Sequence, residues 1–144
     1  MLQGVSVTTT ANYPEPLEPA PVPRRGAILV VEDRDDVRQG LAQLLELHGY
    51  LVFEAANAGE AFAHLESCTN GIALILLDLA LPGCSGSEIR ASQLANAQWA
   101  DIPAIILSAY GPADTDSHAL RPAAWFEKPF RVDQLLGEVR KHVA

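Results

Sequence analysis

The chain has 144 residues, of which 49% are apolar, and a formal net charge of −8. Its length and apolar content suit one globular domain and exclude a disordered chain, and no apolar stretch approaches the roughly 18 residues that cross a membrane. The acidic excess argues against direct contact with nucleic acid. The N-terminus lacks an apolar signal-peptide core, and Cys68 and Cys84 are too far apart for a zinc or redox motif. We therefore expect a cytoplasmic protein that contacts neither membrane nor nucleic acid directly.

The first 25 residues are rich in proline. Five of the ten prolines lie at positions 14, 16, 19, 21 and 23, and closely spaced prolines favour an extended polyproline II geometry that cannot bury a core. We expect residues 1–25 to form a flexible arm or linker, and we favour a spacer over a ligand for an SH3-type domain. Residues 26–144 then form the globular domain.

From Ala27 onward, short apolar runs alternate with segments of helical periodicity. The runs are continuous, which is typical of strands buried on both faces of a parallel sheet. The expected strands are Ala27–Val31, Leu51–Ala55, Ile72–Leu77, Pro103–Leu107 and Ala124–Glu127. Five β-α units with right-handed crossovers predict an α/β fold, a doubly wound three-layer sandwich.

Two of the intervening helices show an apolar stripe at helical spacing. The stripe residues are Val37, Leu41, Leu44, Leu45 and His48 in the first helix and Val132, Leu135, Leu136, Val139 and Val143 in the last. Gly49 is the expected stop of the first helix. The pairs with capping-box spacing, which start the second and third helices, are Asn57 with Glu60 and Ser85 with Glu88. A short fourth helix is expected at about Ala113–Leu120.

Acidic residues close two of the expected strands. Glu32 and Asp33 follow the first strand, and Asp78 follows the third. Ligands of an open parallel sheet bind outside the carboxyl ends of its strands. Neighbouring carboxylates repel one another there unless a hard cation such as Mg²⁺ lies between them. The pattern therefore predicts a divalent-metal site.

Phosphoryl transfer fits the same edge of the sheet. The Asp78 carboxylate can attack a phosphoryl group and form an acyl phosphate. The barrier is mainly electrostatic, so a metal on one side and an ammonium on the other would lower it. Lys128, one of two lysines in the chain, follows the fifth strand, and Ser108, after the fourth, offers a hydroxyl to a phosphoryl oxygen.

Each of these residues has a simpler reading when it is taken alone. An acidic pair such as Glu32 and Asp33 can belong to a helix start, Asp78 can belong to a turn, and Trp125 can be an ordinary core residue. The order of these residues on five β-α units favours the site over the simpler readings.

Together these residues resemble the receiver domain of two-component response regulators, the CheY-like family, over about residues 27–143. The motifs that carry the resemblance are Glu32-Asp33, Asp78, Ser108-Ala109 and Lys128-Pro129-Phe130. The resemblance implies a flavodoxin-like (βα)5 fold with a parallel five-stranded sheet in the order 2-1-3-4-5. It also implies a cis peptide bond between Lys128 and Pro129.

The resemblance assigns Asp78 the role of phospho-acceptor. Asp78 would take a phosphoryl group from the phosphohistidine of a sensor histidine kinase or of a phosphotransfer protein. Ser108 and Lys128 would bind the phosphoryl oxygens. Ser108 and Trp125 would act as the switch that follows phosphorylation.

The resemblance also implies a Mg²⁺ ion, or Mn²⁺ in its place. Its ligands would be Glu32, Asp33, Asp78 and the backbone carbonyl of Ala80. The face formed by the fourth helix, fifth strand and fifth helix would bind a downstream protein, and a phosphorylation-dependent homodimer is allowed. Such a domain catalyses only its own phosphorylation and dephosphorylation, so we do not expect an enzyme that acts on other substrates.

Several alternatives stay open at this point. We expect no output domain after Ala144, which leaves a single-domain regulator, a phosphorelay sink or intermediate, or the receiver segment of a hybrid histidine kinase. An aspartate-nucleophile phosphatase would need a second acid where Ala80 stands. A flavin module would need a glycine-rich phosphate loop after the first strand, and residues 32–36 are instead strongly acidic. A pseudo-receiver would not need the intact acidic residues and lysine. The segment from Ser108 to Lys128 is also shorter than is usual in the family, which predicts a shortened fourth helix.

Overall fold

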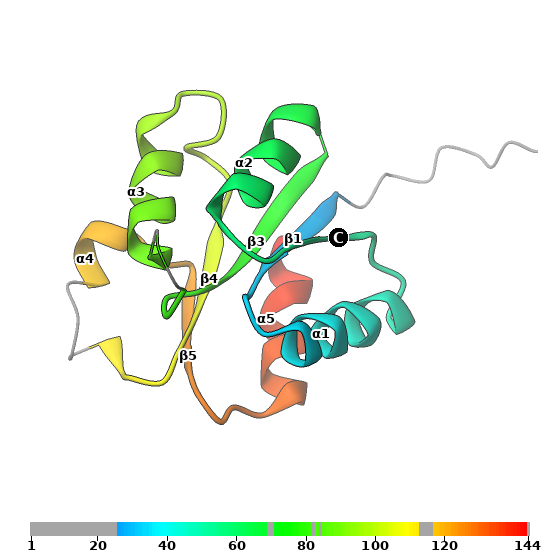
Figure 1. The fold of residues 1–144 in the computed structure, drawn as a ribbon. Coiled ribbons are helices and arrows are strands. Elements are labelled where there is room, and N and C mark those ends of the chain that lie inside the picture. The colour runs from blue at the N-terminus through cyan, green and yellow to red at the C-terminus, as the bar shows by residue number, and fades with distance from the viewer. Residues whose placement is uncertain (1–25, 69–70, 82, 84, 113–116, 144) are drawn as a thin grey trace, which may run out of the picture.

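The computed structural model describes residues 26–68, 71–81, 83, 85–112 and 117–143. Strands and helices alternate along the chain (Figure 1). The strands are β1 (Ala27–Val31), β2 (Val52–Ala55), β3 (Ile72–Asp78), β4 (Ala104–Ser108) and β5 (Ala124–Glu127). The helices are α1 (Asp35–Leu47), α2 (Ala58–Ser67), α3 (Gly86–Ala95), α4 (Ser117–Leu120) and α5 (Val132–His142). Within these residues, no helix has the length and apolarity that a membrane span requires.

The five strands form one parallel sheet in the order β2-β1-β3-β4-β5, as the sequence predicted. Strand β3 lies at the centre, with Val31 of β1 opposite Leu77 on one side and Leu107 of β4 opposite Asp78 on the other. The carboxyl ends of β1, β3 and β4 therefore meet at one edge of the sheet, where the expected site residues stand.

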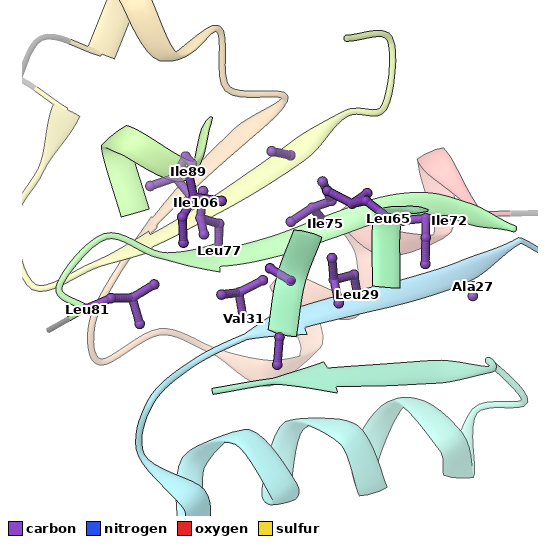
Figure 2. Close-up of a cluster of buried hydrophobic side chains, with 13 residues drawn as sticks. Ala27, Leu29, Val31, Leu65, Ile72, Ile75, Leu77, Leu81, Ile89 and Ile106 are labelled. Carbon is purple, nitrogen blue, oxygen red and sulfur yellow. The ribbon is translucent and has the colours of Figure 1, made fainter. Parts of the chain in front are cut away.

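Helices cover both faces of the sheet, which gives the three layers (Figure 1). Alternate residues of β1 point to opposite faces, so Leu29 packs with α2 and α3, while Ile28 packs with α1 and α5. Figure 2 shows the first of these two clusters, in which Leu65 of α2 and Ile89 of α3 lie over the central strands. Burial of both strand faces explains why these strands are continuously apolar.

Side-chain caps fix the helix starts that the sequence predicted. Ser85 and Glu88 form a full capping box, in which the Glu88 backbone N–H donates to Ser85 Oγ at 3.2 Å and the Ser85 N–H donates to Glu88 Oε1 at 2.9 Å. Asn57 Oδ1 accepts from the Glu60 N–H at 2.9 Å. Gly49 follows α1 with a φ of 89°, a left-handed conformation that glycine adopts without strain.

A buried polar pair on α3 departs from the usual apolar filling of a helix–sheet interface. Arg90 is 3% exposed and Gln93 is 1% exposed. Arg90 Nη1 donates to Gln93 Oε1 at 2.5 Å and to the carbonyl of Ile102 at 3.1 Å. Gln93 Nε2 donates to the Ile102 carbonyl at 2.9 Å. The pair therefore ties α3 to the segment that leads into β4.

The same arginine reaches the end of α4. Arg90 Nε donates to the carbonyl of Leu120 at 2.8 Å, and Nη2 donates to the carbonyl of Arg121 at 2.9 Å. Burial lowers the pKa of Arg90, and the nearby charge of Arg121 lowers it further. Among the residues that the structure describes, no carboxylate forms an ion pair with Arg90. The hydrogen-bond donors of this buried cation are thus satisfied by backbone carbonyls and by Gln93 Oε1.

Two predictions need correction, and two others lie partly or wholly outside the described residues. His48 and Val132 were placed in the apolar stripes, but both are exposed, Val132 by 45%. His48 is the residue after α1, and Val132 is the first residue of α5. Each therefore lies at a helix end, beyond the part of the helix that packs on the sheet. Of the expected fourth helix, residues 117–120 are helical and residues 113–116 lie outside the described part, as does the expected arm, residues 1–25.

Candidate functional site

Three carboxylates from neighbouring strand ends come together. Glu32 and Asp33 leave the end of β1, and Asp78 is the last residue of β3, its neighbour in the sheet. One carboxylate oxygen from each of them lies within 4.8 Å of the others. Glu32 and Asp78 are buried, at 1% and 3% exposed, and Asp33 is half-buried. Charges this close in a partly dry setting repel one another strongly unless a cation compensates them.

The Lys128 ammonium faces two of the three carboxylates. Lys128 Nζ lies 3.2 Å from Asp78 Oδ2 and 3.3 Å from Glu32 Oε1. The lysine follows β5, and its backbone N–H donates to the Ser108 carbonyl at 2.7 Å. The peptide bond that follows, Lys128–Pro129, is cis, as the family resemblance implied. The fold therefore brings a residue 50 positions away in the chain onto the Asp78 carboxylate.

Backbone donors orient the two buried carboxylates. The Arg34 N–H donates to Glu32 Oε2 at 3.1 Å, and the Ala80 N–H donates to Asp78 Oδ1 at 3.0 Å. Each carboxylate thus has one oxygen held by the backbone and the other facing Lys128. This arrangement restrains both carboxylates through both of their oxygens.

Gly86, the first residue of α3, makes this geometry sterically possible. A Cβ at this position would collide with the Asp78 carbonyl oxygen and would come within 2.6 Å of Leu79 Cα. The Gly86 N–H also donates to the Leu79 carbonyl at 3.1 Å. The helix start therefore packs directly against the backbone of the Asp78 segment, and a larger residue would displace it.

A hydrogen-bonded relay joins Ser108 to Trp125. Ser108, the last residue of β4, is buried, and its Oγ accepts from the Tyr110 N–H at 3.0 Å. The Tyr110 carbonyl accepts from Trp125 Nε1 at 2.9 Å. Tyr110 itself is 64% exposed. Both residues that the sequence predicted as the switch therefore bind the backbone of Tyr110, in the short loop after β4. Ser108 bonds to its N–H and Trp125 to its carbonyl.

The electrostatic cost of the cluster is visible at Glu32. Burial raises the pKa of the Glu32 carboxyl, and the Asp78 carboxylate adds to this effect. The Arg34 backbone N–H and the Lys128 ammonium oppose it without cancelling it. Ionised Glu32 thus destabilises the metal-free fold relative to an unfolded chain in water.

This cost predicts a pH dependence of stability. Because the folded pKa of Glu32 lies above the unfolded value, its contribution to stability is fully present below the unfolded pKa and is lost as pH rises through the folded pKa. In the metal-free protein, the free energy of unfolding of wild type relative to Glu32→Gln should therefore decrease as the pH rises from the unfolded pKa to the folded pKa of Glu32. Urea unfolding of both proteins across the acidic range measures this difference, and Glu32→Gln removes the background of the other acids. A difference that does not change with pH would contradict the prediction.

The donor set suits a small hard cation. Three carboxylates that converge within a few ångströms offer the oxygen ligands that Mg²⁺ prefers, with room for the waters that it retains. The structure places each carboxylate that the sequence nominated as a metal ligand in this cluster. Ala80 lies beside it with its N–H on Asp78, and the role of its carbonyl stays a prediction.

A parallel sheet in this order, with a carboxylate cluster and a lysine at its carboxyl edge, defines a CheY-like domain that accepts phosphorylation. The family model of the response regulator receiver domain matches residues 28–140, and the chain belongs to this family. Members of the family are phosphorylation-accepting signalling modules of two-component systems that bind Mg²⁺ in an acidic pocket.

Curated relatives are similar over most of the chain. The phosphate regulon transcriptional regulatory protein PhoB of Pseudomonas aeruginosa is 35% identical over 115 residues, which cover 78% of this chain and 49% of PhoB. The sporulation initiation phosphotransferase F of Bacillus subtilis is 34% identical over 81% of this chain and 92% of that protein. The chain thus spans about half the length of PhoB and nearly all of the phosphotransferase.

Solved structures agree with the fold. A response regulator receiver protein from Pseudomonas putida has a TM-score of 0.77 and 27% identity, covering 84% of this chain and all of that one. The response regulator TrrA of Thermotoga maritima, solved in complex with Mg²⁺ and BeF, has a TM-score of 0.69 and 31% identity, covering 81% of this chain and 97% of that one.

Sequence reasoning missed three residues that shape the site and its surroundings. Gly86 is recognisable only as a glycine beside a cap, because its close approach to β3 depends on how α3 docks. Arg90 lies beside apolar Ile89 and reads as an ordinary helix arginine. Arg38, whose guanidinium contacts the loop after β1, sits next to the stripe residue Val37. None of the three carries a signal in a single sequence that separates it from a surface or spacer residue.

Proposed function

We propose that Asp78 is the phospho-acceptor and that Glu32, Asp33 and Asp78 hold a Mg²⁺ ion beside it. The observation that carries this proposal is the pairing of Asp78 with Lys128 at 3.2 Å inside the carboxylate cluster. Asp78 is a buried carboxylate that pairs with an ammonium and has two further acids close by. Stability alone explains this poorly, because placing like charges near a buried charge is costly. Phosphoryl transfer needs both features.

The chemistry proceeds by displacement at phosphorus. An oxygen of the Asp78 carboxylate attacks the phosphoryl group of a donor phosphohistidine, the phosphorus–nitrogen bond breaks, and the imidazole leaves and takes up a proton from water. Lys128 binds an oxygen of the group being transferred, and the Ser108 hydroxyl donates to another. Glu32, Asp33 and Asp78 would hold the Mg²⁺ ion, which would supply charge that neutralises the carboxylates and the incoming oxygens. Lys128, which pairs with Asp78 in the resting site, would stay beside the acyl phosphate that results.

The donor and the readout follow from the family. We infer that a sensor histidine kinase or a phosphotransfer protein in the cytoplasm supplies the phosphoryl group, and that a downstream protein binds the face of α4, β5 and α5. The domain catalyses its own phosphorylation and dephosphorylation only. The match to nearly the whole length of a phosphotransferase supports a role as a phosphorelay component, and the match to PhoB supports a transcriptional output for a longer protein.

Incubation with acetyl phosphate tests the proposed function. With Mg²⁺ present, intact-mass measurement should show one added phosphoryl group that survives mild acid and is lost in base, as an acyl phosphate requires. Chelation of Mg²⁺ with EDTA should prevent the gain. A phosphoryl group that is stable in base, or one that forms equally well with EDTA, would contradict an Mg²⁺-dependent aspartyl phosphate.

The relay from Ser108 to Trp125 predicts a fluorescence change. A phosphoryl group that recruits the Ser108 hydroxyl alters the loop that Tyr110 shares with the Trp125 indole. Beryllofluoride with Mg²⁺, a phosphoryl mimic, should therefore change the tryptophan emission. Trp125→Phe should remove the change, whereas Trp99→Phe, the matched control, should keep it. An unchanged response in Trp125→Phe would place the reporter at Trp99.

A further inference from the structure

Arg38 makes three contacts at the loop that carries two of the proposed metal ligands. It lies in the first turn of α1, and its side chain is only 11% exposed. Nη1 donates to the Glu32 carbonyl oxygen at 3.0 Å, Nη2 pairs with Asp35 Oδ1 at 2.6 Å, and Nε donates to Glu54 Oε1 at 3.2 Å. One side chain thus joins the end of β1, the start of α1 and strand β2.

The contact with the Glu32 carbonyl is the informative one. This carbonyl belongs to the peptide that joins Glu32 to Asp33, so its direction sets how the two carboxylates are aimed. The Arg34 N–H restrains the Glu32 side chain by donating to its carboxylate. For Asp33, Arg38 is the side chain that restrains the adjoining peptide. The two acids bound by the other nitrogens keep the guanidinium from rotating away.

The planar fork of arginine suits this task and lysine does not. A guanidinium presents donors at fixed angles to several acceptors at once, whereas an ammonium is a compact charge at the end of a flexible stem. Lysine at position 38 would keep the charge but could not hold the Glu32 carbonyl, Asp35 and Glu54 together. Charge and geometry can therefore be separated by substitution.

These two effects act on a bound cation in opposite directions. The positive charge of Arg38 near the cluster disfavours a divalent cation by Coulomb repulsion. The restraint that it places on the Glu32–Asp33 peptide favours the cation, because less ordering remains to be done on binding. The sign of the change in metal affinity upon substitution therefore shows which effect dominates.

We propose that Arg38 is a positioning residue for the metal site, which holds the Glu32–Asp33 peptide so that both carboxylates face Asp78. This inference rests on the proposed function of that site. It assigns Arg38 a net favourable effect on metal binding in spite of its charge. Outer partners of this kind typically change metal affinity by about tenfold when they are removed.

The test is a Mn²⁺ titration of the protein without any phosphodonor, followed by electron paramagnetic resonance of free Mn²⁺, with competition by Mg²⁺. Arg38→Met and Arg38→Lys should both weaken binding by about tenfold. Glu54→Gln, which removes one anchor and leaves the Glu32 contact, should have a smaller effect. Arg140→Met, the control, makes the same charge change at an exposed residue near the end of α5 and should leave the affinity unchanged or slightly higher.

A second readout separates positioning from a general loss of structure. A merely structural role for Arg38 would lower the thermal unfolding midpoint equally with and without Mg²⁺. Positioning predicts that Arg38→Lys also reduces the upward shift that Mg²⁺ produces, because weaker binding stabilises less. Unchanged affinity in Arg38→Lys together with tighter binding in Arg38→Met would overturn the inference and leave the proposed function standing. Absence of saturable binding in wild type would overturn both.

Discussion

Asp78→Asn should reduce phosphoryl labelling by acetyl phosphate to the background level. The amide is no nucleophile toward phosphorus, and among the described carboxylates of the cluster only Glu32 also pairs with Lys128. Glu32 touches Lys128 but is held by the Arg34 N–H, with burial raising its pKa. Intact mass and the base-labile fraction of the label measure the loss.

The matched control for this experiment is Asp101→Asn. Asp101 is exposed in the segment between α3 and β4, so the variant makes the same chemical change away from the site and should label like wild type. Asp78→Asn should also unfold no more easily than wild type without metal, since it removes one of three repelling charges. Continued labelling of Asp78→Asn, with the label mapped to another residue, would refute Asp78 as the acceptor.

Arg90→Met should cause a large loss of stability. The methionine fills much of the same volume but leaves Gln93 Oε1 and the carbonyls of Leu120 and Arg121 without their guanidinium donor. The Ile102 carbonyl keeps its hydrogen bond from Gln93 Nε2. Each unsatisfied buried polar group costs about 1–3 kcal/mol, so a destabilisation of about 3 kcal/mol or more is expected. Urea unfolding at neutral pH measures it.

Arg90→Lys and Arg140→Met make the comparison specific. The lysine keeps a positive charge and can reach some of the carbonyls, so its stability should lie between those of wild type and Arg90→Met. Arg140→Met removes an exposed arginine on α5 and should change stability by less than about 0.5 kcal/mol. A cost below about 1 kcal/mol for Arg90→Met would show that water replaces the guanidinium and that the network has little structural importance.

The strands and the candidate site were predictable because both depend on short-range pattern and on one rule of topology. Continuous apolar runs mark strands buried on both faces, and parallel strands carry their carboxyl ends to a common edge. The proximity of Glu32, Asp78 and Lys128 could therefore be predicted although these residues are far apart in the chain. The identity of the phospho-acceptor still awaits the labelling experiment.

The features that the sequence could not supply depend on distant docking. Arg90 is buried because the fold packs carbonyls from 30 and 31 residues further along the chain against α3. No local sequence pattern predicts this contact. The predicted burial of His48 and Val132 was wrong for the opposite reason. Both continue a helical stripe correctly, yet each sits at a helix end that extends beyond the sheet, so the pattern holds and the burial does not.

The two indoles of this protein differ in a way that serves spectroscopy. Trp125 Nε1 donates to a carbonyl, whereas Trp99 Nε1 is buried and finds no acceptor among the described residues, with its ring stacked on Phe62. In a ¹⁵N-labelled sample, the two indole protons should therefore resonate at well-separated frequencies. One signal would report on the loop beside Ser108, and the other would serve as an internal reference from the segment that follows α3, where Trp99 stacks on Phe62. The resting and phosphorylated populations could then be counted in solution without attaching a dye.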